Sequence, residues 1–230
     1  TDKIFGPGNR YVTTAKMLVS IDPAGCAIDM PAGPSEVMII ADNYASTAFA
    51  AADMLSQLEH GTDSTAVLLA PSEEFAAETL KQIEIQRETL IRNDVISKSL
   101  EESVVLVYEK IEDALVFSNE YAPEHLILSV SDSDKYKEKI HNAGSVFLGN
   151  YSPESVGDYA SGTNHSLPTY GFARAYSGLG TDAFMKSTTF QRLSREGLQN
   201  ISECVIRLAE AEGLDAHANA VKVRLKDEYK

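Results

Sequence analysis

The sequence lacks long apolar runs and paired cysteines, and each absence excludes a class of protein. No apolar run approaches the roughly 20 residues of a membrane-spanning helix, and the first residues lack the order of a signal peptide. Cys26 and Cys204 lie far apart without a CxxC pair, so neither a disulfide framework nor a thiolate zinc site is indicated. Any bound metal would therefore take histidine, carboxylate or amide ligands.

The sequence also has few basic residues. Lys and Arg number 20 against 34 Asp and Glu, a net charge of −14, and the acidic residues are spread along the chain. This balance repels phosphate backbones, so we expect no nucleic-acid partner. At 230 residues, of which 43% are hydrophobic, the chain can bury a substantial core. We expect a cytoplasmic protein with no membrane partner.

Dinucleotide-binding fingerprints are missing as well. Gly6–Asn9 and Met30–Ser35 are turn-forming segments, but neither is a GxGxxG motif or a P-loop. Motif reasoning alone therefore does not predict a dinucleotide.

From Glu36 onward, short β-branched runs alternate with helical patterns, which is typical of βαβ units and a parallel, Rossmann-like α/β sheet flanked by helices. The predicted strands are Val37–Ala41, Ala66–Ala70, Ser103–Tyr108, His125–Val130 and Ser145–Gly149. The predicted helices are Tyr44–Glu59, Glu73–Ile91, Ile111–Tyr121, Ser133–His141 and Ser194–Glu210.

Helix ends carry their own signals. Ser72, and Asp132 or Ser133, are expected to cap helices with their side-chain oxygens, and Gly61 is expected to adopt a left-handed conformation after the first helix. From Gly149 to about Gly180 the chain is rich in Ser, Gly, Pro and Thr, which predicts a long loop of functional interest.

Several segments hold candidate chemical groups. Gln57 and His60 lie three residues apart on a predicted helix, so they share a face and could meet one cation, although a histidine next to a helix-ending glycine more often interacts with the helix dipole. Glu124 and His125 follow Pro123 at a rigid junction and suit an acid/base pair, the alternative being an ordinary strand start.

The long loop offers Asp158 as an anionic ligand and His165 as a donor or acceptor, but turn chemistry could also explain its composition. His217 lies in a tail that is too small to hold its own core. We therefore expect this tail to pack on the sheet domain or on another subunit.

Six segments, in order across essentially the whole chain, resemble the histidinol dehydrogenase family. They are Ile4–Asn9, Ile28–Glu36, Leu58–Gly61, Tyr121–Leu126, Gly157–His165 and Glu212–His217. The resemblance implies oxidation of L-histidinol to L-histidine through the aldehyde with two NAD+, the last step of histidine biosynthesis.

The resemblance also implies roles for individual residues. One zinc ion per subunit would be held by Gln57, His60 and Asp158, and by His217 across the boundary of a domain-swapped homodimer. Glu124 and His125 match the acid/base pair. The positions that match substrate contacts are Ser35, Gln57, His60, His125, Asp158, His165, Glu212 and His217. Asn9 matches a position that contacts NAD.

Members of the family are longer and have an amino-terminal half that this chain lacks. The resemblance therefore implies that residues 1–36 end a second, mostly missing α/β domain, that residues 37–179 form the main Rossmann-like domain, and that residues 180–230 form a small dimerisation domain. We interpret the start at Thr1 as a cut. The NAD site is expected to be incomplete without the missing half, carried on the same polypeptide before cleavage or on a second chain.

Two features are in tension with simple rules. Catalytic zinc usually has three protein ligands rather than four. Ligands of open α/β sheets usually lie beyond the carboxyl ends of the strands, whereas His60 and His125 are expected at the opposite edge. Two other readings stay open: a zinc hydrolase of α/β fold that needs no NAD, and a non-catalytic relative that serves as a binding or assembly module.

Overall fold

The computed structural model describes residues 1–6 and 8–226, so Pro7 in the predicted turn Gly6–Asn9 lies outside the described residues. The chain divides into two compact units, Thr1–Met185 and Lys186–Lys230. Within the described ranges, no helix is long and apolar enough to cross a membrane.

The strands are β1 (Lys3–Ile4), β2 (Ala27–Ile28), β3 (Glu36–Ala41), β4 (Thr65–Ala70), β5 (Val104–Val107), β6 (His125–Ser129) and β7 (Ser145–Leu148). The α-helices are α1 (Arg10–Ile21), α2 (Thr47–Leu58), α3 (Glu73–Arg87), α4 (Asn93–Leu100), α5 (Ile111–Tyr121), α6 (Glu154–Tyr159), α7 (Arg195–Ala211) and α8 (Asp215–Leu225). Three segments are 3-10 helices: η1 (Ser133–Lys139), η2 (Phe172–Arg174) and η3 (Thr181–Phe184).

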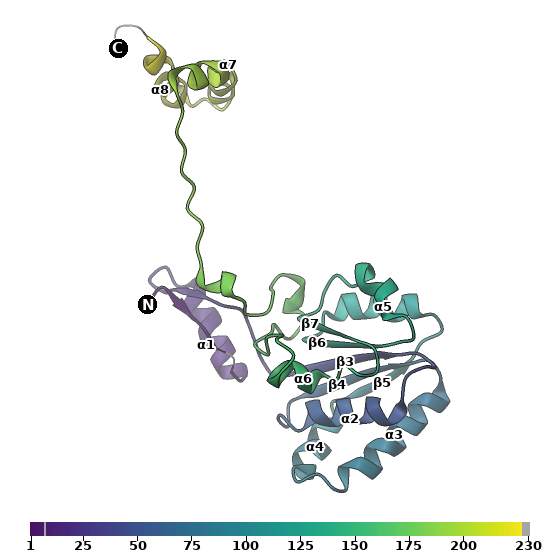
Figure 1. Cartoon of the computed structure of the whole chain (residues 1–230). Helices are drawn as coiled ribbons and strands as arrows, with labels where there is room; N and C mark the ends of the chain where they lie inside the picture. Colours follow the sequence, from purple (N-terminus) through teal and green to yellow (C-terminus); the bar gives the residue numbers. More distant parts are fainter. Residues whose placement is uncertain (7, 227–230) are drawn as a thin grey trace. The chain divides into compact units, whose positions relative to one another are not determined.

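The main sheet is parallel and has the strand order β5-β4-β3-β6-β7 (Figure 1). This is the order of a doubly wound, Rossmann-like sheet, in which the first strand in sequence lies at the centre. Every residue of central β3 is buried, as expected of a parallel sheet covered on both faces. The predicted fold class is therefore confirmed.

Alternation along β3 divides the core into two layers. Val37, Ile39 and Ala41 pack with residues of α2, α3 and α4 on one face, whereas Met38 and Ile40 pack with residues of α5 on the other (Figure 1). Successive side chains of a strand point to opposite faces, so an uninterrupted apolar run serves both layers at once. β1 and β2 form a separate two-stranded parallel sheet in the same unit, next to α1 in sequence.

The five predicted strands agree with β3 to β7 to within one residue at each end, and α5 has the predicted bounds. Ser72 caps α3 by accepting from Phe75 N at 3.2 Å, as predicted. Other predictions were wrong. α3 ends at Arg87, short of Ile91, and α4 follows it. Between the two helices, Thr89 N donates to Gln86 O at 3.3 Å and Leu90 N donates to Arg87 O at 3.1 Å. These bonds reach back three residues instead of four, so the α-helix does not continue.

The predicted helix Ser133–His141 is the 3-10 helix η1, and the Asp132 side chain makes no capping hydrogen bond. Only Tyr136 of this segment is buried, so it lacks the apolar stripe that would stabilise an α-helix against the sheet. Gly61 has no positive φ. α2 instead ends through Glu59, which stays right-handed, so the expected left-handed glycine is not required there.

The predicted loop from Gly149 to Gly180 contains the short helix α6 and the turn η2. Pro153 occupies the N-cap of α6 without a side-chain capping bond, and Gly157 lies within it. Both features weaken the sequence signal for a helix.

The second unit consists of α7 and α8. Ser194 caps α7 by accepting from Gly197 N at 3.0 Å. Gly213, with φ of 72°, makes the left-handed turn between the two helices, and the amide of Leu214 bonds the carbonyl of Ala209 at 2.8 Å. A two-helix unit of this size buries little apolar surface by itself.

Candidate metal and acid/base site

The candidate site lies at the edge of the sheet where β3, β6 and β7 begin. Val37 pairs with His125, and His125 pairs with Ser145. Residues Glu36 and Glu124 therefore precede these pairs at the amino edge, and Glu36 N donates to Glu124 Oε2 at 2.9 Å. The expected edge, opposite the usual ligand crevice, is confirmed for His125.

At the carboxyl edge, by contrast, polar groups bond one another. Asp42 accepts from Ser131 N at 2.8 Å, from Ser131 Oγ at 2.9 Å and from Tyr44 N at 2.8 Å. Ser129 donates to Asn150, whose amide nitrogen bonds Tyr44 O at 3.1 Å. These side chains join neighbouring loops by hydrogen bonds, so fewer polar groups at the carboxyl edge are free to bind a ligand.

Backbone geometry fixes the Glu124–His125 junction. α5 ends at Ala122 in a left-handed conformation, with φ of 58°, and Pro123 then directs the chain into β6. The amide of Ser145 bonds Glu124 O at 2.9 Å. Gly144 makes this approach possible, since a Cβ there would lie 2.6 Å from Glu124 O. The junction is therefore held rigidly between two strands.

His125 is 4% exposed, and its ring contacts limit its protonation. Nδ1 lies 3.3 Å from the carbonyl oxygen of Glu36 and 3.5 Å from Glu124 Oε2. A carbonyl oxygen can only accept, so this contact favours the tautomer with the proton on Nδ1 and the lone pair on Nε2. Burial lowers the pKa of His125 to about 4, against a raising effect of Asp158. The ring is thus neutral near pH 7 and able to accept a proton.

Glu124 is also 4% exposed. Burial raises its pKa well above the usual value, and the negative charges of Glu36, Glu154 and Asp158 add to this effect, while the hydrogen bond from Glu36 N opposes it. A carboxylate with a raised pKa is a stronger base toward water once it has lost its proton.

A cluster of possible cation ligands lies beside this pair. One ligand atom from each of His60, Glu154 and Asp158 lies within 4.8 Å of the other two. Glu154 and Asp158 are four residues apart on α6 and share a face. Burial, and then the charges of Asp158 and Asp53, raise the pKa of Glu154 to about 8. A bound cation would relieve this accumulation of negative charge.

Buried polar atoms without partners fit the same conclusion. The Gln57 side chain is 0% exposed, and neither its amide oxygen nor its amide nitrogen has a hydrogen-bond partner. Both carboxylate oxygens of Glu154, which is 1% exposed, also lack partners. Unsatisfied buried groups cost free energy unless a ligand or ion completes them. Oxygen and imidazole donors of this kind suit zinc.

Ser35 and His165 lie in two segments of the first unit that a hydrogen bond joins. Ser35 is half-buried directly before β3, and its carbonyl accepts from Thr65 N at 3.2 Å. His165 is exposed, but the four residues after it are buried. Thr169 Oγ1 accepts from Gly33 N at 2.7 Å, which joins the His165 segment to the one that carries Ser35.

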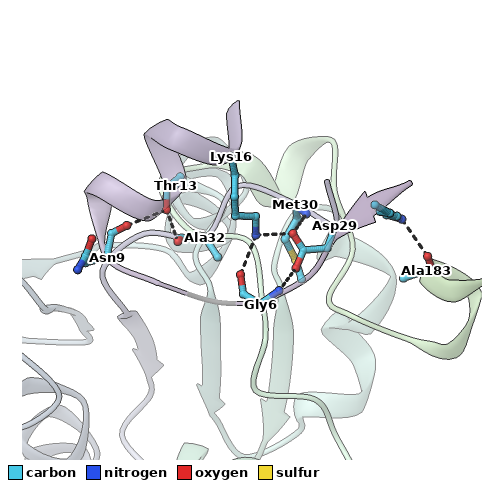
Figure 2. A network of polar contacts seen from close by, with 9 residues as sticks. Gly6, Asn9, Thr13, Lys16, Asp29, Met30, Ala32 and Ala183 are labelled. Carbon is cyan, nitrogen blue, oxygen red and sulfur yellow. Dashed lines mark hydrogen bonds and ion pairs between the residues drawn. The ribbon is translucent and has the colours of Figure 1, made fainter. Parts of the chain in front are cut away.

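Asn9 caps α1 and has its side-chain oxygen engaged, accepting from Tyr11 N at 3.0 Å and Val12 N at 3.2 Å. Figure 2 shows a polar network in which Lys16 of α1 pairs with Asp29 and donates to Gly6 O at 2.7 Å, and Gly6 N donates to Asp29 at 2.8 Å. Burial alone would raise the pKa of Asp29, but these bonds lower it overall. The network is structural and leaves Asn9 exposed.

Glu212 and His217 belong to the second unit. Glu212 is the C-cap of α7, His217 lies in the first turn of α8, and both are exposed. The structure thus brings His60 and Asp158 together, and Glu124 and His125 together, within the first unit.

Sequence reasoning missed Glu36 and Glu154. Glu36 is a charged residue at the head of a wholly apolar strand, and this contrast could have identified it. Glu154 lies one helical turn before Asp158, but this spacing carries information only once α6 is known to be a helix.

Comparison with known proteins identifies the relatives of this chain. The family model for histidinol dehydrogenase matches residues 1–225. Histidinol dehydrogenase of Vibrio parahaemolyticus is 54% identical over 225 residues, covering 98% of this chain and 52% of that protein. The chloroplastic enzyme of Arabidopsis thaliana is 53% identical over 227 residues, covering 98% and 49% respectively.

Among solved structures, the crystal structure of histidinol dehydrogenase from Elizabethkingia anophelis superposes with a TM-score of 0.95 at 53% identity, covering 100% of this chain and 53% of that one. The chain spans about half the length of the curated relatives that it matches.

Proposed function

The chain belongs to the histidinol dehydrogenase family, and from that membership we propose that it forms the zinc-holding half of an enzyme that oxidises L-histidinol to L-histidine through the aldehyde. The observation that carries the proposal is the buried Glu124–His125 pair beside the cluster of His60, Glu154 and Asp158. NAD+ would accept one hydride in each of the two oxidations.

In this proposal, Gln57, His60 and Asp158 hold the metal, together with His217 of a second copy. The unpartnered oxygens of Gln57 and Glu154 support a cation in this region, and Glu154 adds a further buried carboxylate to the set. Bound zinc would supply a Lewis-acidic anchor for the nitrogen lone pairs of the substrate, with no redox role.

His125 serves as the base in both oxidations. Its Nε2 accepts the hydroxyl proton of the alcohol as hydride leaves the carbinol carbon, so that the carbonyl forms without a free alkoxide. The Glu36 carbonyl holds the opposite nitrogen and supports this tautomer. The nearby negative charge of Asp158 favours the imidazolium that results.

Glu124 acts between the two oxidations. Its carboxylate takes a proton from water, the hydroxide oxygen adds to the aldehyde carbon, and protonated His125 returns its proton to the former carbonyl oxygen, which gives a gem-diol and a neutral His125. His125 then accepts a gem-diol proton as the second hydride leaves, which gives the carboxylic acid. Because Glu124 must be ionised and its pKa is raised, the rate should rise with pH until this carboxyl has lost its proton.

The remaining assignments complete the proposal. Ser35, His165 and Glu212 would contact the substrate, and Asn9, exposed at the amino end of α1, would contact NAD+. The partners would be a second copy in a domain-swapped homodimer and the half of the enzyme that precedes this segment in relatives. The proposed location is the cytoplasm.

The test compares His125→Asn with His141→Asn in the complete, zinc-loaded enzyme. Asn removes the base at Nε2 but is small and polar, so zinc content should stay unchanged while histidinol-dependent NADH formation falls by about 100-fold or more. His141 is exposed between η1 and β7 and provides the matched control, which should behave like the parent.

Unaltered oxidation in His125→Asn would remove this residue from the mechanism. Substrate turnover without NAD+ would favour a zinc hydrolase instead. Zinc binding with no turnover of any kind by the parent protein would favour a non-catalytic module.

A further inference from the structure

Glu36 is a carboxylate in a place where a charge is costly. It begins β3, all of whose residues are buried, and is itself 4% exposed. Burial raises its pKa, while hydrogen bonds from Tyr121, Glu124 and Tyr170 oppose the effect. A buried carboxylate is retained only where its hydrogen bonds compensate for lost hydration.

The Glu36 carboxylate joins three segments of the site. Oε1 accepts from Glu124 N at 3.3 Å and from Tyr170 N at 3.1 Å, and Oε2 accepts from the Tyr121 hydroxyl at 3.1 Å. These donors lie at the end of α5, at the acid/base junction and in the segment that follows His165. Neither amide donates to any other group among the described hydrogen bonds, so the carboxylate is their partner.

The main chain of Glu36 contacts the same residues. Its amide donates to Glu124 Oε2 at 2.9 Å, and its carbonyl lies 3.3 Å from His125 Nδ1. Glu36 and Glu124 thus hold each other reciprocally, each side chain bonding the other's backbone amide. Glu36 therefore fixes the position of Glu124, favours one tautomer of His125 and holds the backbone at Tyr170.

The Tyr170 contact is demanding. Tyr170 has φ of 54°, which is uncommon outside glycine. Its ring packs so closely on Gly33 that a Cβ there would lie 2.5 Å from the ring. A strained residue of this kind persists only where its surroundings fix it, and the Glu36 carboxylate supplies one such contact.

We propose that the Glu36 side chain is a positioning residue, which acts as a hydrogen-bond acceptor to fix the Glu124–His125 pair and the His165–Tyr170 segment against each other. It takes no part in proton transfer. The effect expected on kcat rests on the proposed function, whereas the effect expected on amide hydrogen exchange rests only on the hydrogen bonds of Glu36.

Two substitutions of Glu36 separate the effect of side-chain length from the effect of charge. Glu36→Gln keeps the length of the side chain and an oxygen that can accept from both amides, and its NH2 group can donate to the Tyr121 oxygen. Glu36→Asp keeps the charge but is one methylene shorter, so it withdraws from the amides. Glu102→Asp, an exposed residue before β5, is the matched control for the shortening.

In the complete enzyme, Glu36→Asp should lower kcat by about tenfold or more while KM changes little, since a displacement of about 1 Å at a catalytic pair is costly. Glu36→Gln should retain most of the activity. Activity lost in Gln but retained in Asp would mean that the charge matters, and the proposal would be overturned. Full activity in both variants would overturn it as well.

Amide hydrogen exchange, followed by NMR, gives an answer that does not depend on turnover. The amides of Glu124 and Tyr170 should lose protection in Glu36→Asp and keep it in Glu36→Gln. Unchanged protection of both amides in Glu36→Asp would refute the positioning role. If the parent enzyme does not oxidise histidinol, the proposed function fails, but the exchange result still decides the role of Glu36.

Discussion

Asp53 is a carboxyl on α2 that the proposed chemistry does not use. It lies one turn before Gln57, is partly buried, and burial alone raises its pKa from 3.8 to about 7. Its charge also raises the pKa of Glu154. No hydrogen bond to the Asp53 side chain compensates for its burial among the described contacts.

Because Asp53 is buried, we expect the free energy of unfolding to depend on pH. The folded state binds the Asp53 proton more tightly than the unfolded chain, so the stability from this group is full below about pH 4 and is lost as pH rises through about 7. In EDTA-treated protein at pH 8, the free energy of unfolding of Asp53→Asn should therefore exceed that of the parent by about 2 kcal/mol. The variant should accordingly unfold at a higher denaturant concentration.

The advantage of Asp53→Asn should disappear by pH 4, where both side chains are neutral. Asp2→Asn, at an exposed position, is the control and should show no such trend. Equal urea midpoints for Asp53→Asn and the parent at pH 8 would show that the ionised Asp53 carboxylate does not destabilise the folded protein.

Individual residues differed in how well the sequence predicted them. The Glu124–His125 junction was recognisable because proline and a following apolar run define it locally. The partners of Glu36 and Glu154 were not recognisable, because Glu124 and His60 lie 88 and 94 residues away and meet them only through folding. Pairings across such separations carry no local pattern.

At the scale of elements, the position of α6 depends on a glycine within it. Gly157 is buried between Glu154 and Asp158, and a Cβ there would lie 2.8 Å from ring atoms of Phe147 and from Thr163 Oγ1. The glycine therefore lets α6 approach β7 and bring both carboxylates beside His60. Its φ is not positive, so steric contact rather than backbone strain makes glycine necessary.

Gly157→Ala should displace α6 and weaken zinc binding by about tenfold or more, since overpacking of this kind shifts the backbone. Gly180→Ala is the matched control, because a Cβ at Gly180 meets nothing within 4 Å and its φ is −120°. Competition with a fluorescent zinc chelator measures both variants. Parent-like affinity in Gly157→Ala would mean that α6 does not position the ligands.

Elements were predictable to different degrees for physical reasons. The strands β3 to β7 were predicted to within one residue because each is a short run rich in apolar residues. α4 and α6 were missed because they are only 8 and 6 residues long. Helices this short owe their existence to tertiary contacts, such as Ser99 Oγ on α4 donating to Leu58 O at 2.9 Å.

At the scale of the whole molecule, the proposed ligands come from both compact units. Gln57, His60 and Asp158 lie in the first unit, and His217 lies in the second. A two-helix unit cannot bury a core by itself, which supports its packing on other structure. The proposal of a domain-swapped homodimer makes each zinc site depend on two subunits.

Complementation tests this arrangement. His60→Asn and His217→Asn should each lower zinc affinity. If the ligands come from different subunits, a mixed dimer of the two variants keeps one intact site, so mixing and re-equilibration should restore about a quarter of all sites. Titration of bound zinc after mixing gives the measurement. No recovery in verified mixed dimers would place all four ligands within one subunit.

The sequence by itself determined the parallel α/β sheet, the order of its strands along the chain, and the family, because apolar runs and contiguous motifs are local properties. Only the tertiary structure decided which distant groups meet: Glu36 with Glu124, and Glu154 with His60 and Asp158. The physical reason is that a catalytic cluster is assembled where strands begin side by side. Which residues become neighbours there depends on sheet register and helix packing, which no local segment contains.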